Sequence, residues 1–180
     1  MQRVMLGVIA AVALAGLAAG TTATRAQHAH GGAGAQGHQV AQTCASEFEK
    51  VVGEGRGFGL AFAADQNGYP GPMHVLELKD RLKLTADQEA KGRELMHAMF
   101  TESRPKGARL LDAEARLRRL FAERVADAPA VRAAVAEVER VRSEVRLAHL
   151  LTHLKTRDLL TEEQRRIYHE ARWGALPPAP

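Results

Sequence analysis

Two copies of one pentapeptide pattern, Leu-Thr-x-x-Gln, constrain the fold of this chain more than any other feature. The first copy reads LTADQ over residues 84–88, and the second reads LTEEQ over residues 160–164. A Thr followed three residues later by Gln is a capping box, in which both side chains bond backbone N–H groups of the first helical turn. The sequence therefore predicts two helix starts, one capped by Thr85 with Gln88 and one by Thr161 with Gln164.

The sequence after Pro72 has helical periodicity and no strand signal. Apolar residues spaced three and four apart predict a first helix over residues 75–82 and a long second helix over residues 95–121. Pro105 and Gly107 lie inside the second helix and predict a kink or a brief break there.

A third helix is expected from about Pro129 to Asp158, with Asp127 as its N-terminal cap. It carries an apolar seam at a spacing of seven residues, formed by Val131, Val138, Val145 and Thr152. A short fourth helix follows the second pentapeptide. The predicted fold is all-α, with a short N-terminal helix, a long kinked helical hairpin and a short C-terminal helix.

The first 26 residues have the pattern of a secretory signal peptide. A positive start, Met1 to Arg3, precedes an apolar run over residues 4–19, and Thr24-Arg25-Ala26 supplies small residues for cleavage. An uncleaved membrane anchor is the alternative, because the run is marginal for a bilayer span. Either reading predicts export, and we expect a periplasmic protein.

The remaining composition predicts three further regions. Residues 27–68 are rich in Gly, Ala and His and predict a flexible linker, because they offer little apolar surface to offset chain entropy. Residues 69–174 predict the helical domain, and the Pro-rich residues 175–180 predict a disordered tail. The single cysteine, Cys44, excludes an intrachain disulfide and is either a bystander or a bridge between two subunits.

Positive charge is concentrated in the second helix. Residues 104–124 hold seven basic side chains and three acidic ones, and the whole chain has a net charge of +4. Export argues against nucleic acid as the partner. The stretch is either a solvated helix face or a cradle for acidic or unfolded polypeptide or lipid head groups. The candidate client-binding residues are Arg109, Arg116, Arg118 and Arg119.

The segment HLLTH places His149 and His153 four residues apart, on one face of the third helix. Imidazoles one turn apart can share a metal ion. His149 follows Val145 by four residues and so lies on or beside the apolar seam. The pair is either a metal site or a polar patch where the helices of the hairpin part.

The two pentapeptides in a small, exported helical chain resemble the Spy/CpxP family, also called the LTxxQ-motif family. Its members are periplasmic helical-hairpin dimers that act as stress chaperones or as sensors of envelope damage. The segments YPGPMHVLEL and RLAHLLTHLKTRDLLTEEQRRIYHEAR are most similar to the heavy-metal sensor branch, the relatives of CnrX and ZraP. The resemblance covers roughly residues 69–172.

The resemblance also implies metal ligands. His149 matches the first ligand of the third helix, and His153 stands where a soft ligand, often Met, is found. His74 matches a ligand of the first helix, whereas Leu78 stands where a second His is common. For the acidic ligand of the second helix, His97 is the candidate substitute and Glu94 the next. A lone His such as His97 is otherwise a surface residue or a core residue whose hydrogen bonds are satisfied.

The sequence thus predicts a periplasmic protein of heavy-metal or envelope-stress sensing or resistance that binds Zn, Ni, Co or Cu through His74, His97, His149 and His153. Neutral imidazole is required, so affinity should fall below about pH 6. We expect a homodimer without enzymatic activity, whose further partner is either unfolded envelope proteins or a membrane-bound signalling protein. A chaperone that holds unfolded proteins on a basic concave face is the alternative, and a structural envelope protein is a third possibility.

Overall fold

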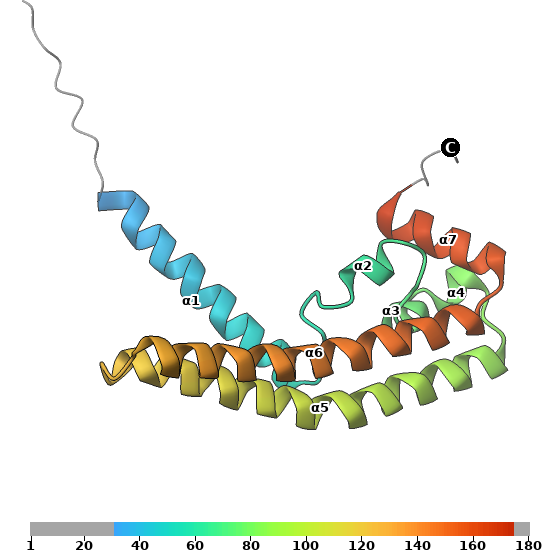
Figure 1. The fold of residues 1–180 in the computed structure, drawn as a ribbon. Coiled ribbons are helices and arrows are strands. Elements are labelled where there is room, and N and C mark those ends of the chain that lie inside the picture. Colours follow the sequence, from blue (N-terminus) through green and yellow to red (C-terminus); the bar gives the residue numbers. More distant parts are fainter. Residues whose placement is uncertain (1–30, 175–180) are drawn as a thin grey trace, which may run out of the picture.

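The computed structural model describes residues 31–174, which form seven helices and no strand (Figure 1). The all-α prediction is confirmed, although the described range holds more helices than the four expected. The helices are α1 Gly31–Gly53, α2 Phe62–Asp65, α3 Pro72–Glu77, α4 Lys79–Leu82, α5 Ala86–Ala122, α6 Ala128–Leu159 and α7 Glu162–Trp173.

Helices α5 and α6 form a long antiparallel hairpin that bows along its length (Figure 1). The short helices α2, α3, α4 and α7 gather at the open end of the hairpin, and α1 rises from its middle. None of the helices in residues 31–174 combines the length and the apolar character needed to cross a membrane. The predicted signal peptide and the predicted tail lie outside the described residues.

Helix α6 matches its predicted span closely. The Asp127 side chain accepts a hydrogen bond from the N–H of Ala130 at 2.7 Å, and Pro129 lies in the first turn. The predicted seam is buried at Val138, Val145 and Thr152, where α6 packs against α5.

The predicted break in the second long helix is not observed. Helix α5 runs without interruption through Pro105. Gly107 instead meets α1, because a Cβ atom at this position would lie 2.5 Å from the carbonyl oxygen of Val52. The glycine therefore allows the backbone of α1 to cross α5 in direct contact. The first predicted helix does divide in two, α3 and α4, at Leu78.

Residues 31–68 differ from the expected flexible linker. Most of them form α1 and α2, and the C-terminal end of α1 packs on α5 through Val51 and Val52, which are buried. The Oγ of Ser103 donates to the carbonyl oxygen of Gly55 at 2.6 Å and ties the following loop to α5. The Gly-rich composition concealed this contact, which rests on a few apolar residues and on backbone polar groups.

Two apolar clusters hold the fold together. One lies along the hairpin where α1 crosses it and consists of Val52, Leu110, Ala113, Val138, Val141 and Val145. The other lies at the open end and consists of Val75, Leu82, Leu160 and Tyr168. Along α6 the stretch between the two clusters carries His149 and His153.

Both predicted capping boxes are present, and they contact each other. The hydroxyls of Thr85 and Thr161 accept the N–H groups of Gln88 and Gln164, each at 3.2 Å. The two glutamine amides then pair across the interface of α5 and α7. Gln88 Nε2 donates to Gln164 Oε1 at 2.8 Å, and Gln164 Nε2 donates to Gln88 Oε1 at 3.0 Å.

The remaining hydrogen of each glutamine amide reaches a helix-end carbonyl. Gln88 Nε2 donates to Leu159 O at 3.0 Å, and Gln164 Nε2 donates to Leu82 O at 3.2 Å. Each Oε1 also accepts the N–H of its own capping Thr. Every polar atom of both amides is satisfied, so the pair joins the start of two helices to the end of two others.

We predict that Gln88→Glu destabilises the protein by about 1–3 kcal/mol, because a carboxylate keeps the cap but leaves Leu159 O without its side-chain donor and removes one of the two donors to Gln164 Oε1. An isolated capping box accepts Glu and Gln alike. Urea unfolding at neutral pH measures the effect, and Gln42→Glu on the exposed face of α1 is the control. Equal stability of Gln88→Glu and wild type would show that the amide pair contributes nothing.

Candidate metal centre

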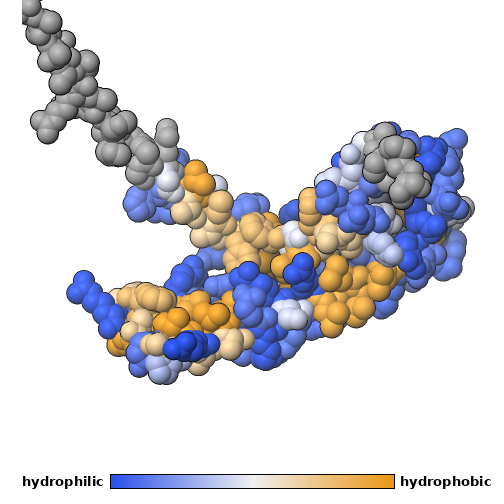
Figure 2. Space-filling view, turned by 45° about the horizontal axis from the view of Figure 1, so that its top comes forward, coloured by the Kyte–Doolittle hydropathy of each residue, from blue (hydrophilic) through white to orange (hydrophobic). Residues whose placement is uncertain are grey.

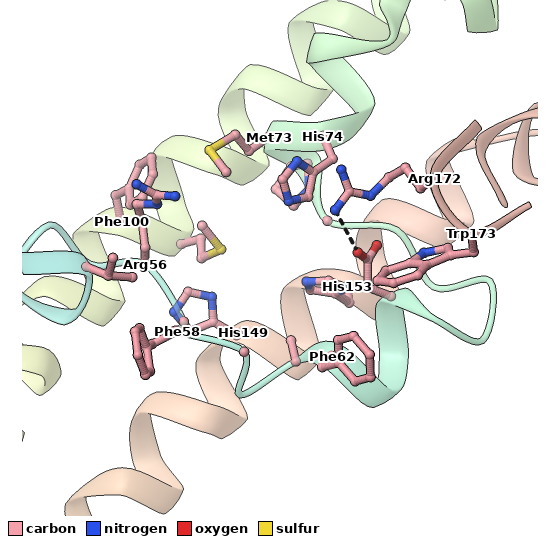
Figure 3. A pocket seen from close by; sticks show the side chains of 18 of the residues that line it. Arg56, Phe58, Phe62, Met73, His74, Phe100, His149, His153, Arg172 and Trp173 are labelled. Atoms are coloured by element: carbon pink, nitrogen blue, oxygen red, sulfur yellow. Dashed lines mark hydrogen bonds and ion pairs between the residues drawn. The ribbon is translucent and has the colours of Figure 1, made fainter. Parts of the chain in front are cut away.

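A cavity of about 480 Å³ lies beside α6 between the two apolar clusters (Figure 3). Its walls come from α1, α2, α3, α5, α6 and α7 and from the loop between α1 and α2. In Figure 2 apolar surface gathers between the α1 arm and the lobe that contains α2 and α7. His74, His149 and His153 all line the cavity.

His149 and His153 occupy successive turns of α6, in the register that buries Val145 and Thr152. Only 4% of His149 and 8% of His153 is exposed. Figure 3 shows both rings on the cavity wall, with His74 approaching from α3. The two imidazoles therefore lie on one face of α6, and both side chains are buried in the fold.

His153 is held in one tautomer. Its Nδ1 lies 2.6 Å from the carbonyl oxygen of Tyr69, and because a carbonyl only accepts, Nδ1 carries the proton. Nε2 therefore keeps its lone pair. Gly71 lies against this nitrogen, since a Cβ atom there would be 3.0 Å from Nε2. A backbone bond that orients the non-ligating nitrogen is the usual support of a metal-binding histidine.

His149 has a buried ring nitrogen with no hydrogen-bond partner, Nε2. Such an atom costs about 1–3 kcal/mol relative to a satisfied one, so its presence in a folded chain requires an explanation. The loop packs on the ring at Gly57, where a Cβ atom would lie 3.2 Å from the His149 Cγ. Gly57 thus allows the backbone to cover the imidazole.

His74 lies at the edge of the cavity and is about one-third exposed. Its Nδ1 is 2.8 Å from the Glu77 carboxylate, with a side-chain exposure of 29%. This contact favours the tautomer in which Nδ1 donates and Nε2 is the free nitrogen. His97 and Glu94, by contrast, are exposed on α5 and do not line the cavity. The structure does not bring His97 to the other three imidazoles.

Asp65 closes the cavity on the side of α7. The hydroxyl of Tyr168 donates to Asp65 Oδ1 at 2.5 Å, and Arg172 Nη2 lies 3.3 Å from Oδ2. Burial raises the pKa of Tyr168, so its hydroxyl stays a donor. Trp173 packs edge-on against Phe62 at 5.3 Å between ring centroids and also lines the cavity.

Burial keeps both imidazoles neutral. It lowers the pKa of His149 from 6.5 to about 4, with a smaller contribution from the neighbouring His153. Burial also lowers the pKa of His153, although the Tyr69 carbonyl and Asp65 oppose the shift. Neutral imidazole is the metal-binding form. Competition by protons at His149 therefore sets in below the pH of about 6 that applies to an ordinary histidine.

The donor set fits a metal ion in part. Within residues 31–174 no three His, Cys, Asp or Glu side chains converge closely enough to form a coordination shell. The orphaned Nε2 of His149 and the oriented Nε2 of His153 nevertheless supply two neutral nitrogen donors on one wall of the cavity. Two imidazoles with additional ligands suit the later first-row transition metals.

The family model for heavy-metal resistance matches residues 57–166, which include all three cavity histidines and both pentapeptides. The chain belongs to the heavy-metal resistance family. No curated protein and no solved structure matches the chain. The family match begins at Gly57, in the loop that covers His149, and thus upstream of the boundary predicted at Tyr69.

Membership of the heavy-metal resistance family supports a role in the response to heavy metals at a general level. The sensor branch expected from the resemblance remains a prediction. Among the described residues, three of the four candidate client-binding arginines form ion pairs within the fold: Arg109 with Glu144, Arg116 with Glu137 and Arg118 with Glu49. Arg119 is exposed.

The segment that covers the cavity, residues 54–71, was not predicted from the sequence. Tyr69, Gly57 and Gly71 contact His149 or His153, and the charge of Asp65 acts on His153. All four residues lie in or directly after the presumed linker of residues 27–68. The alternating glycines of GEGRGFG were the available signal, because closely spaced Gly indicates close backbone approach.

We predict that His149→Gln weakens the pH dependence of stability. Between pH 6.5 and about 4 the unfolded chain binds a proton at this position that the folded chain excludes, so wild-type stability falls as the pH decreases through this window. Glutamine does not titrate, so the variant lacks this decrease in the free energy of unfolding, which is on the order of 1–3 kcal/mol over that range.

Urea unfolding across this pH range measures the effect. His97→Gln is the matched control, because His97 is exposed on α5 and lines no cavity. A His149→Gln variant with the slope of wild type would contradict the buried, neutral state of His149.

Proposed function

We propose that this chain binds a transition metal ion in the cavity and acts in heavy-metal sensing or resistance. One observation carries the proposal: the buried Nε2 of His149, which has no partner in the fold and borders a cavity shared with a second oriented imidazole. A polar patch where helices part, the alternative reading of the pair, does not account for a nitrogen that is shielded from water and unbonded.

The proposed ligands are the Nε2 atoms of His149 and His153, with His74 as the ligand from α3. His153 is oriented by the Tyr69 carbonyl and His74 by the Glu77 carboxylate. His97 is not included, because it is exposed away from the cavity. The metal would supply an electrostatic link between α3 and α6 that the apolar clusters do not provide.

Metal binding would be signalled through the segment that covers the cavity, residues 54–71. Residues 54–71 pack on both imidazoles through Gly57 and Gly71, and Asp65 connects this cover to α7. A metal that pulls His74 toward α6 favours the closed arrangement of these elements and thereby changes the surface offered to a partner. Asp65, through Tyr168 and Arg172, would carry the change to the C-terminal helix.

Export to the periplasm and dimerisation remain part of the proposal. A stripe of exposed apolar residues on α6, Leu147, Leu151 and Leu154, offers a surface for a second copy. The chaperone alternative has weaker support, because intramolecular ion pairs engage most of the arginines that would hold a client.

We predict that tag-free protein binds Zn, Ni, Co or Cu and that the double variant His149→Ala/His153→Ala loses about 100-fold or more in affinity. Trp173, the only tryptophan, lines the cavity, so its fluorescence reports binding at this place. Cys44→Ser is used as the background in all proteins, because an exposed thiol can itself bind metal ions.

His97→Ala is the matched control and should bind like the parent. Equal affinities of the parent and of the His149/His153 double variant for all four metals would refute the proposed site.

A further inference from the structure

We propose that the cavity is selective for a soft monovalent d¹⁰ cation such as Cu(I), bound by the thioethers of Met73 and Met99 together with His149 and His153. This inference rests on the proposed function, because it specifies the class of metal for the same site. It adds two ligands, both sulfur atoms, from α3 and α5.

The two methionines reach the cavity from different helices. Met73 follows Pro72 in the first turn of α3, and Met99 is a buried residue of α5 with 7% exposure. Figure 3 shows the Met73 side chain directed into the cavity beside His74. Met96, almost one turn before Met99 on α5, does not line the cavity. The register of α5 therefore turns Met99 toward the cavity and leaves Met96 outside it.

The carboxylates near the cavity are not available as inner ligands. Both oxygens of Asp65 are engaged, one by Tyr168 and one by Arg172. Glu47 is exposed at the rim on α1. The donors that remain inside are two buried imidazole nitrogens and two thioether sulfurs, all neutral, and the His74 imidazole lies at the edge of the cavity.

A neutral donor set in an apolar cavity favours low charge on the ion. The solvation lost on burial grows with the square of the charge, so a divalent ion loses about four times as much as a monovalent ion of equal size. Thioether sulfur is also a soft ligand that selects Cu(I) over harder divalent ions. Charge and softness thus point to the same class of cation.

Core packing alone accounts for the buried methionines but not for the unbonded nitrogen that borders the same cavity. A buried Met needs no ligand to be stable, and Met commonly fills irregular space. The unpartnered Nε2 of His149, however, borders the same cavity and is itself independent of the methionines. A cation bound between them satisfies this nitrogen, whereas apolar packing leaves it unbonded.

Ag(I) serves as a redox-inert probe of this site, with Zn(II) as the divalent comparison. The protein is the tag-free full chain in the Cys44→Ser background, which removes the exposed thiol. Carbon-labelled methionine methyl groups are observed by NMR, and Trp173 fluorescence gives the affinity. We expect one equivalent of Ag(I) to shift the methyl signals of Met73 and Met99 and to leave that of Met96 in place.

The double variant Met73→Leu/Met99→Leu conserves side-chain volume. It should lower Ag(I) affinity by about tenfold or more while changing Zn(II) affinity by less than about threefold. Met96→Leu is the matched control on the same helix and should bind both ions like the parent. The methyl shifts of the parent protein provide the test even if the double variant does not fold.

The outcomes separate the two proposals. If Ag(I) leaves both cavity methyl signals unmoved, or binds the double variant as tightly as the parent, the soft-cation inference is overturned. Retained Zn(II) binding that depends on His149 and His153 would then leave the proposed function intact. Absence of Ag(I) binding together with absence of binding by Zn, Ni, Co and Cu would overturn both.

Discussion

The reciprocal amide pair of Gln88 and Gln164 fixes the open end of the hairpin. Each glutamine caps its own helix, bonds the other glutamine and bonds the last carbonyl of another helix. The ends of α4 and α6 are thereby joined to the starts of α5 and α7. Leu160 and Tyr168 are buried beside this junction and place α7 over the cavity. The position of the histidine site depends on this arrangement.

At the cavity, the stability of the fold and the proposed metal binding favour different side chains at positions 149 and 153. Apolar packing would favour leucine at positions 149 and 153 of the α6 seam, where the fold instead buries two imidazoles and leaves one nitrogen unbonded. The cover of residues 54–71 closes over them through glycine and a carbonyl bond to His153. The neighbouring clusters offset this local cost, and the result is a pair of neutral, buried imidazoles beside the cavity.

Local chemistry predicted most of the hairpin from the sequence. The capping boxes, the Asp127 cap and the burial of His149 and His153 follow from spacing along one helix. What was missed depends on contacts between distant residues. The Gln88–Gln164 pair joins residues 76 positions apart, and Gly107 reads as a helix breaker until α1 is seen to cross there. His97 was expected at the site, yet the register of α5 directs it to the surface and turns Met99 inward.

We propose that the metal binds at the Nε2 atoms of the two buried histidines, His149 and His153. Long-range proton–nitrogen NMR spectra of the imidazoles, recorded with and without one equivalent of Zn(II), test it directly. Both Nε2 signals should move to metal-bound positions, while Nδ1 of His153 keeps its proton in the bond to Tyr69. Shifts confined to other histidines, with the signals of His149 and His153 unchanged, would contradict it.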